Sequence, residues 1–136
     1  MVGIYLSGTG NTKHCVEKLV SMLEDTAKIV PLENTQITNI LEQQDVIILG
    51  YPTQFSNAPF MVRDFIKRNA QLWRGKKVFC LNTMGLFSGD GTGCSARLLT
   101  TVARIPSPYR KVTEKVLFAY KLTQNKAHQS TLRHYI

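Results

Sequence analysis

Short apolar runs alternate with segments of helical periodicity over the first hundred residues. The runs predict four strands, and the last two are continuous rather than alternating, as in strands buried on both faces: Val2–Leu6, Lys28–Leu32, Val46–Leu49 and Val78–Leu81. Apolar residues at helical spacing predict four helices. These are Thr12–Glu24, Thr38–Leu41 (reaching Glu42), a segment with Pro59 in its first turn, and Ser95–Val102. This order predicts an α/β sandwich built on a parallel sheet.

The chain after residue 100 has a different pattern. Ile105-Pro106-Ser107-Pro108 breaks the preceding helix. The run Val116–Leu122 predicts a fifth strand, and Lys126–Tyr135 predicts a short final helix with Asn125 as its cap. A chain of 136 residues suits one compact domain and is too short for two. We therefore expect a single domain over residues 1–136, with 101–136 as an atypical C-terminal segment that could support a homo-oligomer.

The formal net charge of +8 is unevenly distributed. Residues 1–100 hold ten Lys/Arg and eight Asp/Glu, whereas residues 101–136 hold seven basic residues and one acid. These basic residues are not grouped with stacking aromatics, so the charge does not favour nucleic-acid binding. The sequence contains no apolar run of membrane-spanning length and no leader pattern, which predicts a cytoplasmic protein without a membrane span.

The three cysteines, Cys15, Cys80 and Cys94, form no C-x-x-C pair. We expect free, buried or half-buried thiols, and neither a metal site nor a redox role.

The segment Ser7–Thr12, S-G-T-G-N-T, lies between the first predicted strand and helix. It is not a Walker loop, because Asn11 rather than lysine follows Gly10, and it is not a dinucleotide fingerprint, because Lys13 occupies the third glycine position. A C-x5-R phosphatase loop also fails at all three cysteines. Such a loop can still hold a phosphate through helix amides, the helix dipole and its hydroxyl and amide side chains. A capped turn without a ligand is the alternative.

Ser7–Thr12 resembles the phosphate loop of the flavodoxins, [ST]-x-T-G-N-[ST], and matches it at every defined position. The predicted loops Tyr51–Pro59, Y-P-T-Q-F-S-N-A-P, and Asn82–Gly91, N-T-M-G-L-F-S-G-D-G, strengthen the resemblance. The F-S-G-D-G stretch is similar to flavodoxin domains that accompany ferredoxin-type iron–sulfur modules. The likeness covers about residues 2–100. It implies a flavodoxin-like three-layer sandwich with a parallel sheet of order 2-1-3-4-5, and FMN as the cofactor.

The resemblance also implies which residues contact FMN. The 5′-phosphate would be held by Ser7, Gly8, Thr9, Gly10, Asn11 and Thr12. One side of the flavin ring would be bordered by Pro52, Thr53, Gln54, Phe55, Ser56 and Asn57. The other side would be bordered by Thr83, Met84, Gly85, Phe87, Ser88, Gly89 and Asp90. Tyr51 is expected either to touch the flavin or to pack, Asp90 to touch the flavin or to cap the next helix, and Trp73 to pack elsewhere.

The function that the resemblance implies is electron transfer to a redox partner protein, of ferredoxin type or a reductase, with no catalytic acid or base. The alternatives are an FMN-dependent NAD(P)H:quinone-type reductase and a regulatory or binding domain without cofactor on the same fold. A receiver domain is disfavoured, because Gly50 and Tyr51 stand where its acid would follow the third strand. Two features depart from the family: its members that replace ferredoxins are usually acidic, and the usual glycine-containing fifth strand and long last helix are missing after Leu99.

Overall fold

Within the part of the chain that the structure describes, five parallel strands form one sheet in the order β2-β1-β3-β4-β5. The computed structural model describes residues 1–84, 89–103 and 118–121. Its elements follow in the order β1 (Val2–Tyr5), α1 (Asn11–Leu23), β2 (Lys28–Pro31), α2 (Ile37–Glu42), β3 (Val46–Pro52), α3 (Phe60–Arg68), the 3-10 helix η1 (Ala70–Trp73), β4 (Lys77–Met84), α4 (Gly91–Ala103) and β5 (Phe118–Lys121). The predicted fold class and sheet order are confirmed.

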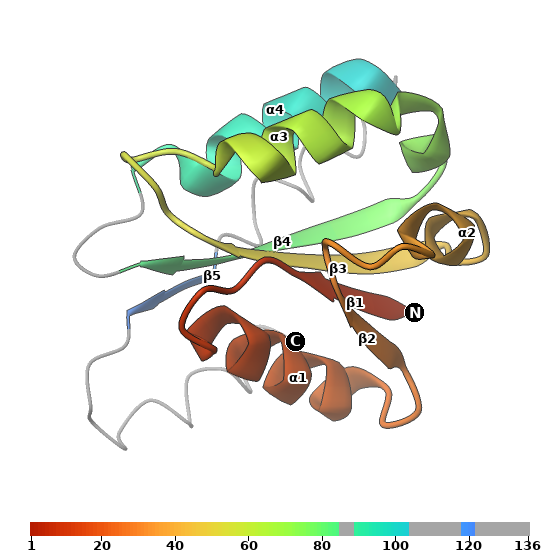
Figure 1. Cartoon of the computed structure of the whole chain (residues 1–136), viewed down its shortest axis with the longest axis horizontal. Helices are drawn as coiled ribbons and strands as arrows, with labels where there is room; N and C mark the ends of the chain where they lie inside the picture. The colour runs from red at the N-terminus through yellow and green to blue at the C-terminus, as the bar shows by residue number, and fades with distance from the viewer. Residues whose placement is uncertain (85–88, 104–117, 122–136) are drawn as a thin grey trace.

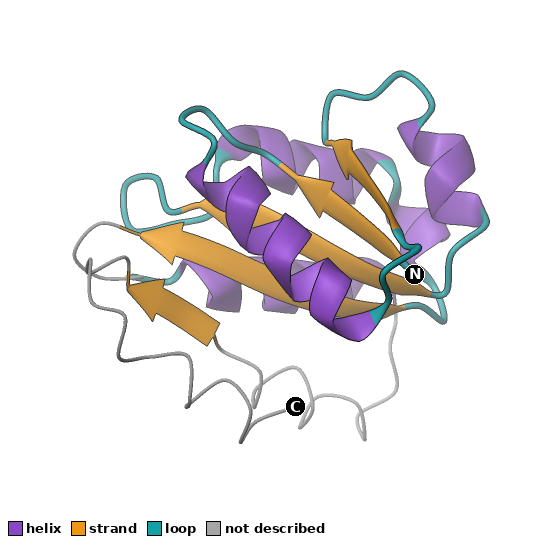
Figure 2. Ribbon diagram, turned by 90° about the horizontal axis from the view of Figure 1, so that it is seen from below, coloured by secondary structure: helices purple, strands orange, loops and turns teal. Residues whose placement is uncertain are grey.

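Helices cover both faces of the sheet, which gives the three-layer arrangement (Figure 1). The helices α3 and α4 lie side by side on one face, and α1 lies on the other, where it crosses the sheet (Figures 1 and 2). Successive residues of β3 point to opposite faces. Ile47 and Leu49 therefore join the core beneath α3, with Val62 and Ile66, while Ile48 packs against α1. All of these side chains are fully buried.

Trp73 is part of the α3 core, in agreement with its predicted packing role. It is fully buried, donates a hydrogen bond from Nε1 to the Ile66 carbonyl at 3.1 Å, and contacts the Phe65 ring edge-on with 5.7 Å between centroids. The 3-10 helix that carries it was not predicted, because four residues are too short for a periodic signal.

Several element boundaries differ from the predictions. The strand β3 continues through Gly50 and Tyr51 to Pro52, and β4 begins at Lys77 and continues through Asn82 and Thr83 to Met84. These added residues keep the parallel register, so Asn82–Met84 belong to a strand rather than to a loop. The helix α4 begins at Gly91, four residues before the predicted start, and Pro59 precedes α3 instead of lying in its first turn.

The predicted fifth strand is confirmed for Phe118–Lys121, which pairs with Leu81–Met84 of β4. The predicted break at Ile105–Pro108 and the predicted final helix Lys126–Tyr135 lie outside the described residues.

Candidate functional site

Three connections emerge at one edge of the sheet, where the adjacent strands β1, β3 and β4 end. From β1 the chain passes first to β2, on one side of β1, and then to β3, on the other side of β1. The order of the strands therefore reverses at β1, beside these connections. Such a switch point is where ligands bind in open parallel sheets. The connections are residues 6–10, 53–59 and 85–90, of which 85–88 are not described. Most of the candidate residues therefore lie at one edge, while Gly85, Phe87 and Ser88 lie outside the described residues.

The first connection, residues 6–10, leads directly into the N-terminus of α1. Gly10 is the N-cap residue with φ 90°, and its N–H donates to Ser7 Oγ at 3.1 Å. The first helical bond is from His14 N to Gly10 O at 2.9 Å, so the amides of Asn11, Thr12 and Lys13 lack a helical acceptor. No described side chain caps these amides. Within the described residues the turn itself is stabilised by the bond from Gly10 N to Ser7 Oγ, while the amides of Asn11, Thr12 and Lys13 stay available to a ligand.

The surface of this connection is open. A Cβ at Gly8 or Gly10 would meet no described atom within 4 Å, and Thr9 and Asn11 are exposed. Thr12 differs from its neighbours because it is 2% exposed and its hydroxyl lies 2.7 Å from that of Thr83, at hydrogen-bond distance. Open amides, hydroxyls and a helix N-terminus together form a site suited to an anion.

The second connection contains a tight turn with an exposed phenylalanine at its tip. Gln54 and Asn57 exchange two backbone hydrogen bonds of 2.9 Å each, and both residues between them have positive φ, 48° at Phe55 and 58° at Ser56. This is the backbone of a type I′ turn, which glycine and asparagine usually occupy. The Phe55 side chain is 103% exposed, so the fold itself gains no burial from it.

The third connection packs against that turn at the two residues described before α4. Asp90 N donates to Ser56 O at 2.7 Å, and a Cβ at Gly89 would lie 2.5 Å from the same oxygen. Gly89 itself has φ 51°. The loops that follow β3 and β4 are therefore in direct contact, although they are more than thirty residues apart in the sequence.

Buried polar side chains lie beneath these connections. Thr53 Oγ1 donates to Asn82 Oδ1 at 2.5 Å, and Thr53 N donates to the Thr83 carbonyl at 2.8 Å. Asn82 is fully buried and Thr83 is 5% exposed. Asn82 was not among the predicted site residues. The sequence indicates Asn82 only by its position, because its amide side chain comes directly after the apolar run that ends at Leu81.

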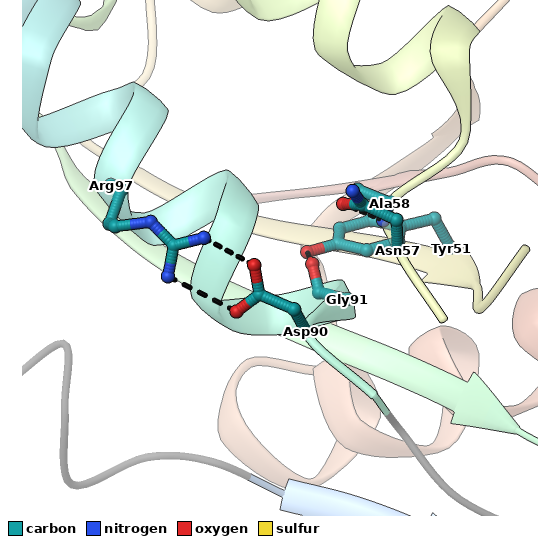
Figure 3. Close-up of polar contacts among 6 residues, drawn as sticks. All are labelled: Tyr51, Asn57, Ala58, Asp90, Gly91 and Arg97. Atoms are coloured by element: carbon teal, nitrogen blue, oxygen red, sulfur yellow. Dashed lines mark hydrogen bonds and ion pairs between the residues drawn. The ribbon is translucent and has the colours of Figure 1, made fainter. Parts of the chain in front are cut away.

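Tyr51 packs in the core, which decides between its two predicted roles. It is fully buried, and its hydroxyl donates to the Gly91 carbonyl at 3.1 Å, as Figure 3 shows. Burial raises the pKa of the phenol, and the neighbouring Cys80 thiol raises it further. Burial also raises the pKa of Cys80 to about 11, so both groups stay protonated at neutral pH.

Asp90 forms an ion pair with Arg97, two turns into α4 (Figure 3). It lies directly before α4, and its carbonyl accepts the first hydrogen bond of that helix, from Cys94 N at 2.8 Å. Its contact with the flavin stays a prediction. The hydrogen bond from the guanidinium holds the pKa of the carboxyl below its usual range. In the same view Asn57 Oδ1 accepts from the next backbone amide, that of Ala58, at 2.8 Å. The Asn57 side chain thus stabilises the end of the turn.

A hollow of about 280 Å³ lies between the first and second connections. Four predicted residues line it: Ser7, Gly8, Pro52 and Gln54. Sequence reasoning missed the other lining residues, Leu6, Glu33, Pro59, Phe60 and Met61. Phe60 is 71% and Met61 49% exposed, so the rim of the hollow is apolar on the α3 side. This volume is near the lower end for small-molecule pockets.

Other chemical groups are limited within the described residues. The three cysteines are free and half-buried, as predicted. No cluster of three or more His, Cys, Asp or Glu side chains in residues 1–84, 89–103 and 118–121 could hold a metal ion. None of the described helices is long and apolar enough to cross a membrane.

Comparisons with known proteins agree with this architecture. The family model described as "Flavodoxin domain" matches residues 2–107. The solution structure of two-electron reduced Megasphaera elsdenii flavodoxin is 28% identical, with TM-score 0.63 over 76% of this chain and 79% of that one. A flavodoxin from the domain Archaea is 16% identical, with TM-score 0.64 over 75% of this chain and 73% of that one.

A third structure is the K13G mutant of Fusobacterium nucleatum flavodoxin bound to flavin mononucleotide. It is 21% identical, with TM-score 0.54 over 76% of this chain and 62% of that one. A sequence comparison with curated proteins finds no match. Because the family model spans most of the chain, from the first strand to beyond α4, this protein belongs to the flavodoxin domain family.

Proposed function

We propose that this chain binds FMN at the edge formed by β1, β3 and β4 and transfers electrons to and from a redox partner protein. The observation that carries the proposal is the start of α1. There the amides of Asn11, Thr12 and Lys13 have no helical acceptor and no described capping side chain, next to the open surface of Gly8 and Gly10. A phosphate would satisfy these donors and interact favourably with the helix dipole.

The residues fit the two chemical parts of FMN. Ser7, Thr9 and Asn11 offer hydroxyl and amide donors to the phosphate, in addition to the backbone amides. The isoalloxazine ring is flat and largely apolar, and Phe55 presents an exposed aromatic face at the adjacent turn. Gly89 and Asp90 contact the back of that turn and would fix its distance from the ring. The membership in the flavodoxin family and the FMN-bound neighbour support this assignment.

The isoalloxazine supplies the redox chemistry when FMN is bound, so the chain's own residues bind, orient and shield it. Backbone groups of the turn at 54–57 and of Gly89 would then determine which edge of the ring reaches solvent. No acid–base residue is required for this role. Tyr51 and Cys80, whose pKa values are raised by burial, are positioned in the core beneath α4 rather than at the open edge.

A fluorescence titration tests the proposal. FMN fluorescence should be quenched by the purified protein and saturate at one FMN per chain. An absence of quenching, with the protein folded by circular dichroism, would favour a regulatory or binding domain without cofactor. If FMN binds, reversible photoreduction without NAD(P)H-dependent quinone turnover is the expected result for a carrier, whereas steady-state turnover would identify a quinone-type reductase.

A further inference from the structure

Two consecutive residues near the end of β4 contact the two walls of the candidate site, which are the first turn of α1 and the turn that follows Thr53. The Thr83 hydroxyl lies 2.7 Å from that of Thr12, in the first turn of α1. Asn82 Oδ1 accepts from Thr53 Oγ1, at the start of the turn that carries Phe55, at 2.5 Å. Neighbouring strand residues point to opposite faces, so each of these side chains reaches a different wall.

Simple core packing does not explain these residue types. Asn82 is fully buried and Thr83 is 5% exposed, and they follow the apolar segment Val78–Leu81 of the same strand. Buried polar groups stabilise a fold only when they are hydrogen-bonded. Asn82 Nδ2 has no hydrogen-bond partner among the described residues. A buried donor without a partner destabilises the fold. The asparagine at position 82 is therefore better explained by its hydrogen bond to Thr53 than by packing in the core.

We propose that Asn82 and Thr83 are positioning residues, each of which fixes a different part of the candidate site. Thr83 fixes the first turn of α1 through Thr12, and therefore fixes the amides that hold the phosphate. Asn82 fixes Thr53, and therefore the turn that presents Phe55 to the flavin ring. The proposal rests on the proposed FMN function and assigns each end of that ligand to one residue of β4.

The two ends of the ligand can be separated experimentally, because riboflavin has the ring and ribityl chain of FMN but no phosphate. Removing the Thr83 hydroxyl should weaken only the binding of FMN. Removing the Asn82 amide should weaken FMN and riboflavin by the same factor. A general loss of stability would not produce this difference, since it would act on both ligands through the same fraction of folded protein.

The test measures dissociation constants of FMN and riboflavin for the whole chain and for Thr83→Val, Thr83→Ser and Asn82→Leu. Thr83→Val keeps the side-chain shape, and we expect its FMN dissociation constant to rise about tenfold, as for one lost hydrogen bond. Its riboflavin constant should change less than about twofold, because the Thr83 hydroxyl is buried against Thr12 and riboflavin carries no phosphate for the amides of α1 to hold. Thr83→Ser keeps the hydroxyl and should retain the FMN affinity of the unmodified chain.

Asn82→Leu should raise both constants together, by roughly three- to tenfold for one hydrogen bond. The double variant with Thr53→Val should lose no more than Asn82→Leu alone, because both substitutions remove the same bond. Thermal unfolding of each variant verifies that it is folded at the titration temperature. If Asn82→Leu does not fold, Thr53→Val alone replaces it and should show the same equal loss.

The proposal is overturned if Thr83→Val weakens both ligands equally, if Thr83→Ser loses as much FMN affinity as Thr83→Val, or if Asn82→Leu changes neither ligand. These results leave the proposed FMN function intact, provided that the unmodified chain binds FMN. If the unmodified chain binds neither ligand, the FMN function fails and this assignment fails with it.

Discussion

Ser56 and Gly89 lie so close together that position 89 has no room for a side chain. A Cβ at Gly89 would lie 2.5 Å from both the carbonyl oxygen and the Cβ of Ser56. The same Ser56 oxygen accepts a hydrogen bond from Asp90 N at 2.7 Å. The turn after β3 and the segment before α4 therefore form one unit, and the position of one depends on the other.

This contact predicts that Gly89→Ala is more destabilising than an alanine at a glycine with similar backbone geometry. Gly75 is the matched control, because it has φ 75° against 51° at Gly89 and no described atom within 4 Å of its Cβ position. Gly75→Ala should cost about 1 kcal/mol for the left-handed backbone. Gly89→Ala should cost a further 1–3 kcal/mol or so for overpacking against Ser56. Thermal unfolding measures both, and equal losses would show that the Ser56 contact is unimportant.

The same pair should differ in flavin affinity. Gly89→Ala displaces the turn that carries Phe55 and should weaken FMN binding, whereas Gly75→Ala lies between η1 and β4 and should leave it unchanged. A Gly89→Ala protein that is folded and binds FMN as tightly as the unmodified chain would contradict the role proposed for this contact.

Phe55 should matter for the ligand and little for the fold. Its side chain is fully exposed, so Phe55→Ala removes no buried contact and should change the free energy of unfolding by less than about 0.5 kcal/mol. FMN affinity should fall about two- to tenfold, which corresponds to one aromatic stacking contact. The control is Met22→Ala, another exposed apolar side chain, on α1, for which no change in FMN affinity is expected. Equal FMN affinity in Phe55→Ala would assign Phe55 no part in binding.

The strands and the connections between them could be predicted from the sequence, because apolar periodicity and the spacing of S-G-T-G-N-T are local signals. The ends of the strands could not. Pro52 and Asn82 are residues typical of loops, yet β3 and β4 hold them in register in the parallel sheet. The partner of Asn82 is Thr53 and that of Thr83 is Thr12, and no local pattern pairs residues so distant in sequence.

The roles of individual side chains were similarly decided by distant partners. Tyr51 is a core residue whose hydroxyl donates to the carbonyl of Gly91, forty residues later in the sequence. The lining residues Phe60 and Met61 do carry a local signal in the sequence. They are apolar but lie off the helical stripe of Val62 and Ile66, which is how an exposed apolar rim appears in a sequence.

Alkaline pH should destabilise the protein through Cys80 and Tyr51. Burial raises the pKa of Cys80 from 9.0 to about 11 in the folded chain, and it also raises that of Tyr51. Both groups lose their proton more easily when unfolded. The contribution of Cys80 to stability is therefore complete below pH 9 and is lost as the pH rises through 11, whereas that of Tyr51 declines only above pH 10. Each unit of pKa difference corresponds to about 1.4 kcal/mol. Urea unfolding between pH 8 and 11 measures this loss.

The variants Cys80→Ala and Tyr51→Phe supply the control for the pH experiment. Each removes one titrating group, so the slope of the free energy of unfolding against pH should become shallower in both. A slope between pH 9 and 11 that is unchanged in both variants would show that other groups cause the alkaline loss.

The central claim is that the start of α1 binds the phosphate of FMN, and the FMN dissociation constant of Thr9→Glu tests it most directly. Thr9 is exposed on the open loop beside Gly10, so a glutamate there should fold normally and place a negative charge and extra volume in the phosphate site. Thr9→Ser, which keeps the hydroxyl, is the matched control. We predict saturable quenching of FMN fluorescence by the unmodified chain and by Thr9→Ser, and none by folded Thr9→Glu. Undiminished FMN affinity in Thr9→Glu, or no binding by the unmodified chain, would contradict the account.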